Sequence, residues 1–135
     1  MLEVSEMDWL QMKRVMSKAG PYPVEAFQFI REGLAHTAKT VHGDKACDAE
    51  APEDSRHISG QQLCLGLRDY AIKRYGLLAR TVLNKWHIEG TEDFGKIVYA
   101  LVEADEMRKS EGDSMEDFVN VYDFEEAFGD VQMRP

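Results

Sequence analysis

The sequence predicts a mainly α protein with a small β-hairpin, an α+β chain of five to six helices in one globular domain over residues 1–128. Apolar residues recur every three or four positions in successive segments, each bounded by capping residues, glycine or proline, as in amphipathic helices. One short segment near the C-terminus carries β-branched and aromatic residues instead. The chain has 135 residues, 44% of them hydrophobic, which is enough to bury a core without a disulfide or metal. No apolar run approaches the length of a membrane span, so no membrane partner is expected.

Two helices are expected in the first third of the chain. Ser5 and Asp8 resemble a capping box, and the helical spacing of apolar residues after them ends at Gly20. Pro23 fits the first turn of a second helix, and Gly43 closes it. Each helix presents one apolar stripe, so both are expected to pack on a common core.

A third helix is predicted from Ser59, which forms an S-x-x-Q capping box with Gln62, to Gly76. At about 100° per residue, Leu65 and Ile72 fall on the side opposite the main apolar face. A helix that is apolar on two faces is either central or shared with a partner. Leu65 and Ile72 are therefore the candidate interface of a homodimer.

A fourth helix follows Gly76 and stops near His87, and Thr91 caps a fifth helix with a strong apolar stripe. Arg74 lies on the main apolar face of the third helix, where a charged side chain is unusual. Either it reaches solvent at the helix end, or it forms a buried pair with an acidic residue of the fifth helix or of the tail.

The segments 107–110 and 118–122 are predicted to pair as the β-hairpin, because the second is rich in β-branched and aromatic residues. Asp123 and Glu126 form a capping box for a short last helix. The resulting order of helices and hairpin over residues 59–122 is that of a winged-helix-like unit.

The segments outside these elements indicate the compartment. Residues 43–55 are acidic and hold no large apolar residue, so they predict an acidic loop, and residues 129–135 predict a flexible tail. The acidic N-terminus lacks the basic and apolar regions of a signal peptide. Cys47 and Cys64 have no metal-type or redox spacing and are expected to be reduced thiols. The lack of a signal peptide predicts a cytoplasmic protein.

The net charge of −9 is unevenly distributed along the chain. Residues 1–55 carry 6 basic and 10 acidic residues, residues 56–90 carry 6 and 2, and residues 91–135 carry 4 and 13. The helix after Thr91, which would read DNA in a winged-helix protein, is acidic, so a nucleic-acid partner is disfavoured. Four cations of the middle segment form a candidate basic face: Arg68, Lys73, Arg80 and Lys85.

Common catalytic motifs are missing, and the four histidines lack metal-ligand spacing, so the sequence predicts no cofactor, no metal and no catalytic residue. One segment has a chemical rationale as an anion or ligand site. Arg56, His57, Ser59 and Gly60 place a guanidinium and an imidazole at a helix N-terminus, whose free N–H groups attract anions. In the alternative interpretation Ser59 is only a cap, Arg56 pairs with a loop carboxylate and His57 is a turn residue.

Several blocks of the sequence, spread over roughly Trp9 to Phe128, together resemble a family of uncharacterised bacterial proteins found chiefly in planctomycetes and verrucomicrobia. The blocks are Tyr22-Pro23-Val24-Glu25-Ala26-Phe27-Gln28-Phe29, Arg56-His57-Ile58-Ser59-Gly60-Gln61, Gly66-Leu67-Arg68-Asp69-Tyr70-Ala71, Gly76, Thr81-Val82-Leu83-Asn84-Lys85-Trp86, Thr91-Glu92-Asp93-Phe94-Gly95-Lys96-Ile97-Val98 and Tyr122-Asp123-Phe124-Glu125-Glu126-Ala127-Phe128. The family has no assigned activity, substrate or cofactor, so the resemblance implies no functional residue. It implies a small stand-alone cytoplasmic protein or module.

The expected function is therefore a non-enzymatic protein–protein interaction module that self-associates. One alternative is a winged-helix-type nucleic-acid-binding regulator that uses the basic face within residues 56–90. The other is a small-anion-binding protein or enzyme that uses Arg56 and His57.

Overall fold

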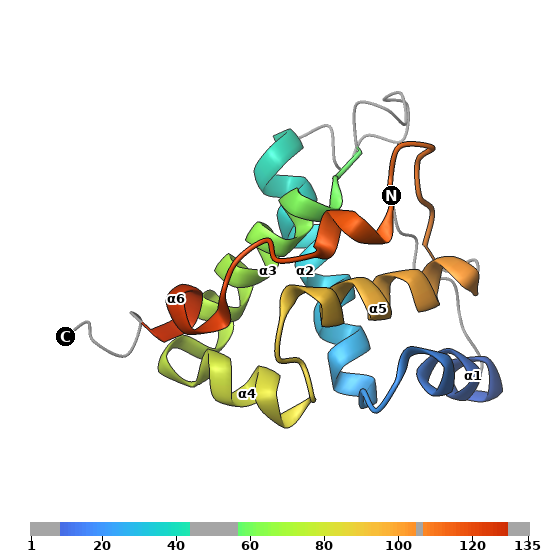
Figure 1. Ribbon diagram of the computed structural model, residues 1–135, viewed down its shortest axis with the longest axis horizontal. Helices are drawn as coiled ribbons and strands as arrows, with labels where there is room; N and C mark the ends of the chain where they lie inside the picture. Colours follow the sequence, from blue (N-terminus) through green and yellow to red (C-terminus); the bar gives the residue numbers. More distant parts are fainter. Residues whose placement is uncertain (1–8, 44–56, 105–106, 130–135) are drawn as a thin grey trace.

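The computed structural model describes residues 9–43, 57–104 and 107–129, and these residues form helices joined by loops (Figure 1). The elements in chain order are α1 (Trp9–Ala19), α2 (Val24–His42), α3 (Gly60–Tyr75), η3 (Gly76–Leu78), α4 (Ala79–Lys85), α5 (Thr91–Glu103), η4 (Met115–Phe118) and α6 (Phe124–Gly129), where η marks a 3-10 helix. The predicted cap at Ser5 and Asp8 and the predicted tail from residue 130 onward lie outside the described residues. So does the predicted acidic loop, except for Gly43.

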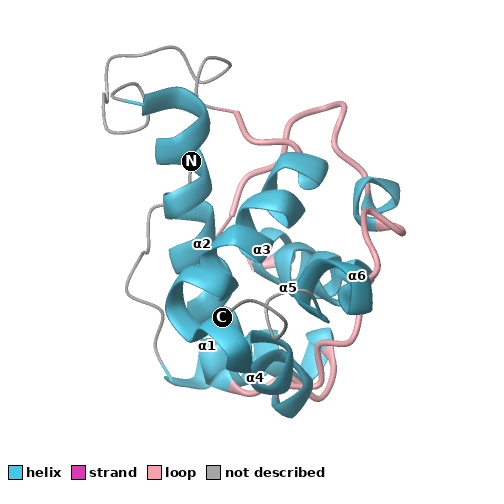
Figure 2. Ribbon diagram, turned by 90° about the vertical axis from the view of Figure 1, so that its left-hand side faces the viewer, coloured by secondary structure: helices cyan, strands magenta, loops and turns pink. Residues whose placement is uncertain are grey.

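The predicted β-hairpin is wrong, although the mainly α prediction is confirmed. No strand occurs in the described residues, and the segment 107–122 is a loop that contains η4 (Figure 2). The backbone N–H of Val121 donates to Thr91 Oγ1 at 3.2 Å, and that of Asn120 donates to Glu92 at 2.9 Å. Side chains of α5 thus bind the amides that a partner strand would have bound. The winged-helix-like unit over residues 59–122 is wrong for the same reason, since it has no wing.

The α2 and α3 helices pack closely because glycines face the opposite helix. A methyl group at Gly66 of α3 would lie 1.8 Å from Thr37 Oγ1 of α2, and one at Gly33 would lie 2.2 Å from Leu67. At Gly66 the neighbour is the branched Thr37 side chain, so no side chain fits there unless the helices move apart. At Gly33 the neighbour is the end of the Leu67 side chain, which would have to turn away. Figure 1 shows α2 and α3 side by side.

The start of α3 is built as the sequence predicts. Ser59 accepts a hydrogen bond from the Gln62 N–H at 3.1 Å, and the Gln62 side chain accepts one from the Ser59 N–H at 2.9 Å. The fifth helix differs, because Gly90 and not Thr91 is its N-cap. Asp93 accepts the Gly90 N–H at 3.2 Å. Thr91 is buried and binds the residues 107–128, which we name the C-terminal segment.

The α5 helix joins the two ends of the described chain, since α1 and η4 both pack on it. Its residues Phe94, Ile97 and Leu101 are fully buried in the core. Tyr22, in the turn between α1 and α2, donates a hydrogen bond to Asp93 on the first turn of α5. No helix among the described residues is both long and apolar enough to cross a lipid bilayer.

Candidate functional site

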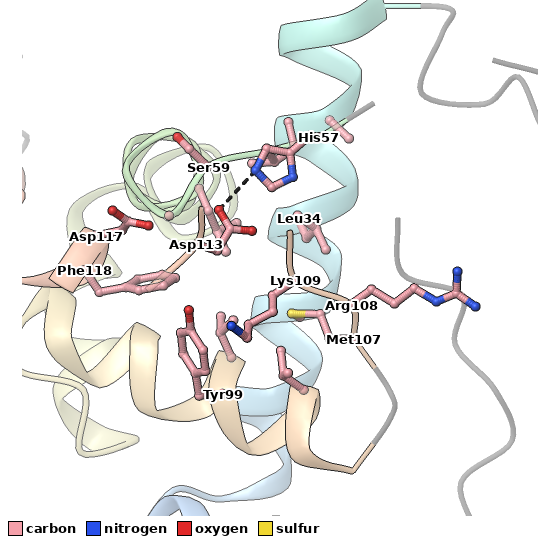
Figure 3. Close-up of a pocket in the computed structure, with 16 residues that line it drawn as sticks. Leu34, His57, Ser59, Tyr99, Met107, Arg108, Lys109, Asp113, Asp117 and Phe118 are labelled. Carbon is pink, nitrogen blue, oxygen red and sulfur yellow. Dashed lines mark hydrogen bonds and ion pairs between the residues drawn. The ribbon is translucent and has the colours of Figure 1, made fainter. Parts of the chain in front are cut away.

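A cavity of about 80 Å³ lies where the start of α3, the end of α5 and the loop 107–114 meet α2 (Figure 3). Three of the four residues predicted as a ligand site line it, namely His57, Ser59 and Gly60. Arg56 lies outside the described residues.

Ser59 and Gly60 serve the fold at this place. The Ser59 hydroxyl is occupied by the capping box of α3. A methyl group at Gly60 would lie 2.7 Å from Asp117 Cβ and 3.0 Å from the Phe118 ring. The space beside the Gly60 backbone, which the sequence analysis assigned to a ligand, is therefore filled by Asp117 and Phe118. The first turn of α3 is therefore covered by the C-terminal segment.

His57 connects the lead-in to α3 with the loop after α5. Its Nε2 lies 3.1 Å from Asp113 Oδ1, its Nδ1 lies 3.0 Å from Ser110 Oγ, and its carbonyl oxygen lies 2.7 Å from His42 Nε2. If Nε2–H donates to Asp113, then Nδ1 accepts the hydroxyl proton of Ser110, which is the polarity of a catalytic triad. Ser110 does not line the cavity, however, and it shares one turn with Asp113, whose backbone N–H donates to the Ser110 carbonyl at 3.0 Å. These hydrogen bonds therefore hold the segment before α3 to the loop after α5.

Sequence reasoning missed the other polar residues of the cavity. Asp113 lies 56 residues from His57 in the chain, and no local motif signals that distance. Tyr99, on the last turns of α5, and Lys109 also point into the cavity (Figure 3). The only sequence signal for Tyr99 is an aromatic residue next to the apolar stripe of α5, a pattern also typical of core packing.

The cavity holds charges of both signs. Burial, together with the nearby carboxylates of Asp113 and Asp117, raises the pKa of the Tyr99 hydroxyl and keeps it protonated. Lys109 is exposed and has no ion pair among the described residues. The apolar floor is formed by Leu34, Ala38, Leu63, Val98, Val102 and Met107.

The residues of the predicted basic face lie on α3 and α4, but they do not act alike. Arg68 lies 3.1 Å from Asp69 and its guanidinium is 6.0 Å from the centre of the Tyr122 ring, so its charge is already engaged. Lys73, Arg80 and Lys85 are exposed.

Arg74 is exposed and pairs with neither of the expected partners. Its guanidinium lies 3.4 Å from Glu32 of α2, and 5.9 Å and 5.6 Å from the ring centres of Tyr70 and Tyr75. It therefore covers the margin of the α2–α3 interface with its guanidinium in solvent.

The two predicted interface residues lie in different environments. The Leu65 side chain is 42% exposed, whereas Ile72 packs against the core. Larger exposure occurs at the corner between α3 and α4, where Leu77 is 55% and Leu78 is 61% exposed. We name Leu77 and Leu78 the apolar corner; the exposed cations Lys73, Arg80 and Lys85 are near them in the sequence, on α3 and α4.

An open groove of about 490 Å³ lies between the start of α5 and the start of α6. Its lining includes the acidic residues Glu89, Glu92, Asp123 and Glu126, and we name it the acidic groove. Within the described residues, no three His, Cys, Asp or Glu side chains are placed to hold a metal ion.

Cys64 is a buried free thiol under the C-terminal segment. Burial raises its pKa to about 12, so at neutral pH it is a protonated, unreactive group. Its carbonyl oxygen accepts a hydrogen bond from the Tyr122 hydroxyl at 2.7 Å.

No family model, curated protein or solved structure matches this chain, so the resemblance noted from the sequence blocks stays a prediction.

Proposed function

We propose that this protein is a non-enzymatic protein-interaction module that self-associates through the apolar corner. The observation that carries the proposal is the adjacent pair Leu77 and Leu78, each with more than half of its side chain in solvent. Single exposed leucines are common on monomers, but two together on a short 3-10 turn between packed helices form a small apolar patch.

The charge around the pair determines the kind of surface that fits it. No acidic residue occurs between Asp69 and Glu89, whereas Lys73, Arg80 and Lys85 all face solvent there. A partner must therefore offer apolar area with acidic residues at its rim.

The chain itself carries such an acidic surface close to the corner. The α4 helix, which carries Arg80 and Lys85, packs on α6, and the acidic groove runs along the start of α6. A two-fold axis beside α4 would place the corner of each copy against the groove of the other, so one surface is self-complementary. This supports a second copy of the chain as the partner.

Sedimentation velocity over the micromolar range tests the proposal. We expect a concentration-dependent dimer that dissociates in high salt, because its charge pairs lie at an exposed rim. The double change Leu77→Ser/Leu78→Ser removes the apolar pair and should give a monomer. Val119→Ser is the matched control, since Val119 is 49% exposed on the C-terminal segment and should not affect association.

Two results would overturn the proposal: a wild-type monomer at every concentration, or a dimer that survives the double change. Leu65→Glu separates the two candidate faces. If it alone abolishes the dimer, the interface is the outer face of α3 and the apolar corner is not part of it.

A further inference from the structure

Two hydrogen-bond donors in the cavity beside α3 have no partner among the described residues. Lys109 extends its ammonium group into the cavity from the loop after α5, and Tyr99 directs its hydroxyl there from α5 (Figure 3). The Tyr99 ring is held by an edge contact with Phe118, with the ring centres 6.2 Å apart. The hydroxyl is thus positioned by packing, without a hydrogen bond to the described residues.

Both carboxylates of the cavity accept hydrogen bonds from the protein. Asp113 accepts the Ser110 N–H at 2.8 Å through one oxygen and contacts His57 Nε2 through the other. Asp117 accepts the Ser114 N–H at 3.1 Å. Lys109 and Tyr99, in contrast, donate to no described residue, and a ligand that complements these two donors presents an acceptor.

The floor and the volume of the cavity determine the rest of the ligand. The floor is formed by aliphatic side chains of α2, α3 and α5 with Met107. A volume of about 80 Å³ is far below the roughly 300–1,000 Å³ of ordinary cofactor and drug sites, so the apolar part of the ligand is short.

Asp113 and Asp117 favour a ligand with one negative charge over a ligand with two. Inorganic phosphate would bring up to two negative charges close to Asp113 and Asp117 and would leave the apolar floor uncovered. A carboxylate brings one negative charge, which Lys109 balances, and its aliphatic chain covers the floor.

We propose that this cavity binds a carboxylate that carries a short aliphatic chain, with the carboxylate between Lys109 and Tyr99 and the chain against the floor. Two sources share this chemistry: a free short-chain acid, and the C-terminal residue of a peptide. The site is separate from the apolar corner and does not depend on self-association.

Titrations followed by NMR of the isotope-labelled full chain test the site. The probes are 4-methylpentanoate, its amide 4-methylpentanamide, inorganic phosphate, and a pair of peptides that end in leucine with a free or an amidated C-terminus. We expect 4-methylpentanoate to shift the resonances of Tyr99, Val102 and Met107, with binding weaker by about tenfold for the amide because it lacks the charge that Lys109 neutralises. Phosphate should shift none of them.

The two peptides identify the source of the carboxylate. Tighter binding of the free-C-terminus peptide than of 4-methylpentanoate assigns the cavity to a peptide end. The reverse order assigns it to a free acid.

Lys109→Gln should weaken binding of the carboxylate about tenfold and leave binding of the amide unchanged. Lys96→Gln is the matched control, because Lys96 is an exposed lysine of α5 that lies 3.8 Å from Asp93, outside the cavity. The proposal is overturned if no carboxylate shifts the cavity resonances at millimolar concentration, if the amide binds equally well, or if Lys109→Gln behaves as Lys96→Gln.

Discussion

The α2–α3 interface and the C-terminal segment from Met107 to Phe128 both cover the core, but they are held by different interactions. At the α2–α3 interface, Gly33 and Gly66 let the side chains of the opposite helix approach the backbone. The C-terminal segment has little regular structure, and hydrogen bonds that each involve a single side chain hold it to α5 and α3. Added side-chain volume destabilises a closely packed interface. A segment held by single hydrogen bonds is instead destabilised when one polar atom is removed.

Gly66→Val should have the largest effect, because even the first carbon of its side chain overlaps Thr37 of α2. We expect a loss of about 3 kcal/mol in the free energy of unfolding, measured by urea denaturation. Gly112→Ala is the control, since nothing lies within 4 Å of a methyl group there. Adding Thr37→Ala should restore part of the loss. A Gly66→Val protein as stable as Gly112→Ala would show that the helices can separate freely.

Thr91→Val keeps the shape of the side chain and removes the hydroxyl that binds the C-terminal segment. This hydroxyl donates to the Phe118 carbonyl at 2.6 Å and accepts the Val121 N–H at 3.2 Å. We expect a loss of about 2 kcal/mol, with faster amide exchange in residues 118–122 and unchanged exchange in α2 and α3. Thr40→Val removes an exposed hydroxyl bond within α2 and should have little effect. If amide exchange became faster by the same factor throughout the protein, the Thr91 hydroxyl would not act locally on the C-terminal segment.

Tyr122→Phe should cost about 1 kcal/mol, because it removes the hydroxyl bond to the Cys64 carbonyl. It should also change the dependence of stability on pH. Burial raises the pKa of Tyr122, so the folded state keeps the proton that an unfolded tyrosine loses near pH 10. Its contribution is fully present below about pH 10 and declines as the pH rises above that value.

Urea midpoints at pH 8 and above pH 10 measure this decline. It should be smaller in Tyr122→Phe than in the wild type. Tyr22 also has a raised pKa, caused by burial and by its bond to Asp93, so the double change with Tyr22→Phe should reduce the decline further. An unchanged decline in both variants would show that neither tyrosine is buried.

Arg74→Ala should have the smallest effect. Both members of the Arg74 and Glu32 pair are about half exposed, and their charges are 3.4 Å apart in solvent. We expect no measurable shift of the urea midpoint at physiological salt, because exposed pairs are screened. A large loss would instead favour the buried pair that the sequence pattern allows for.

The same difference explains how far the sequence could predict the fold. The helices that pack on the core can be predicted from the local spacing of apolar residues. The cap of α3 can be predicted from Ser59 and Gln62, which are three residues apart. The hairpin prediction failed because Val119 and Val121 have strand propensity, whereas the N–H groups of Asn120 and Val121 are bound by side chains of α5, Glu92 and Thr91. Propensity describes a residue by itself and does not identify a distant side chain that will bind it.

Only part of the candidate cavity could be predicted from the sequence, as was true of the fold. Ser59 and Gly60 could be singled out because a helix start is a local pattern, and both line the cavity. Asp113, Tyr99 and Lys109 reach it only because α5 and the loop after it fold back over α3, and Lys109 in sequence is one cation in an acidic segment. The side chains of the cavity come from three separate elements, so their positions in the sequence follow no fixed spacing that a motif could describe.

The position of α5 also has a consequence for the order in which the chain folds. The partners of α5 come from both sides of it in the sequence, and Tyr22 is 71 residues before Asp93. During synthesis α2 and α3 are complete before α5 and can pair with each other, because their mutual contacts need no later part of the chain. The α1 helix and the Tyr22 turn then wait for α5, and the C-terminal segment is fixed last. A ribosome stalled before residue 91 should therefore carry a protease-sensitive α2–α3 hairpin, and one stalled after residue 128 with a linker should carry a resistant domain.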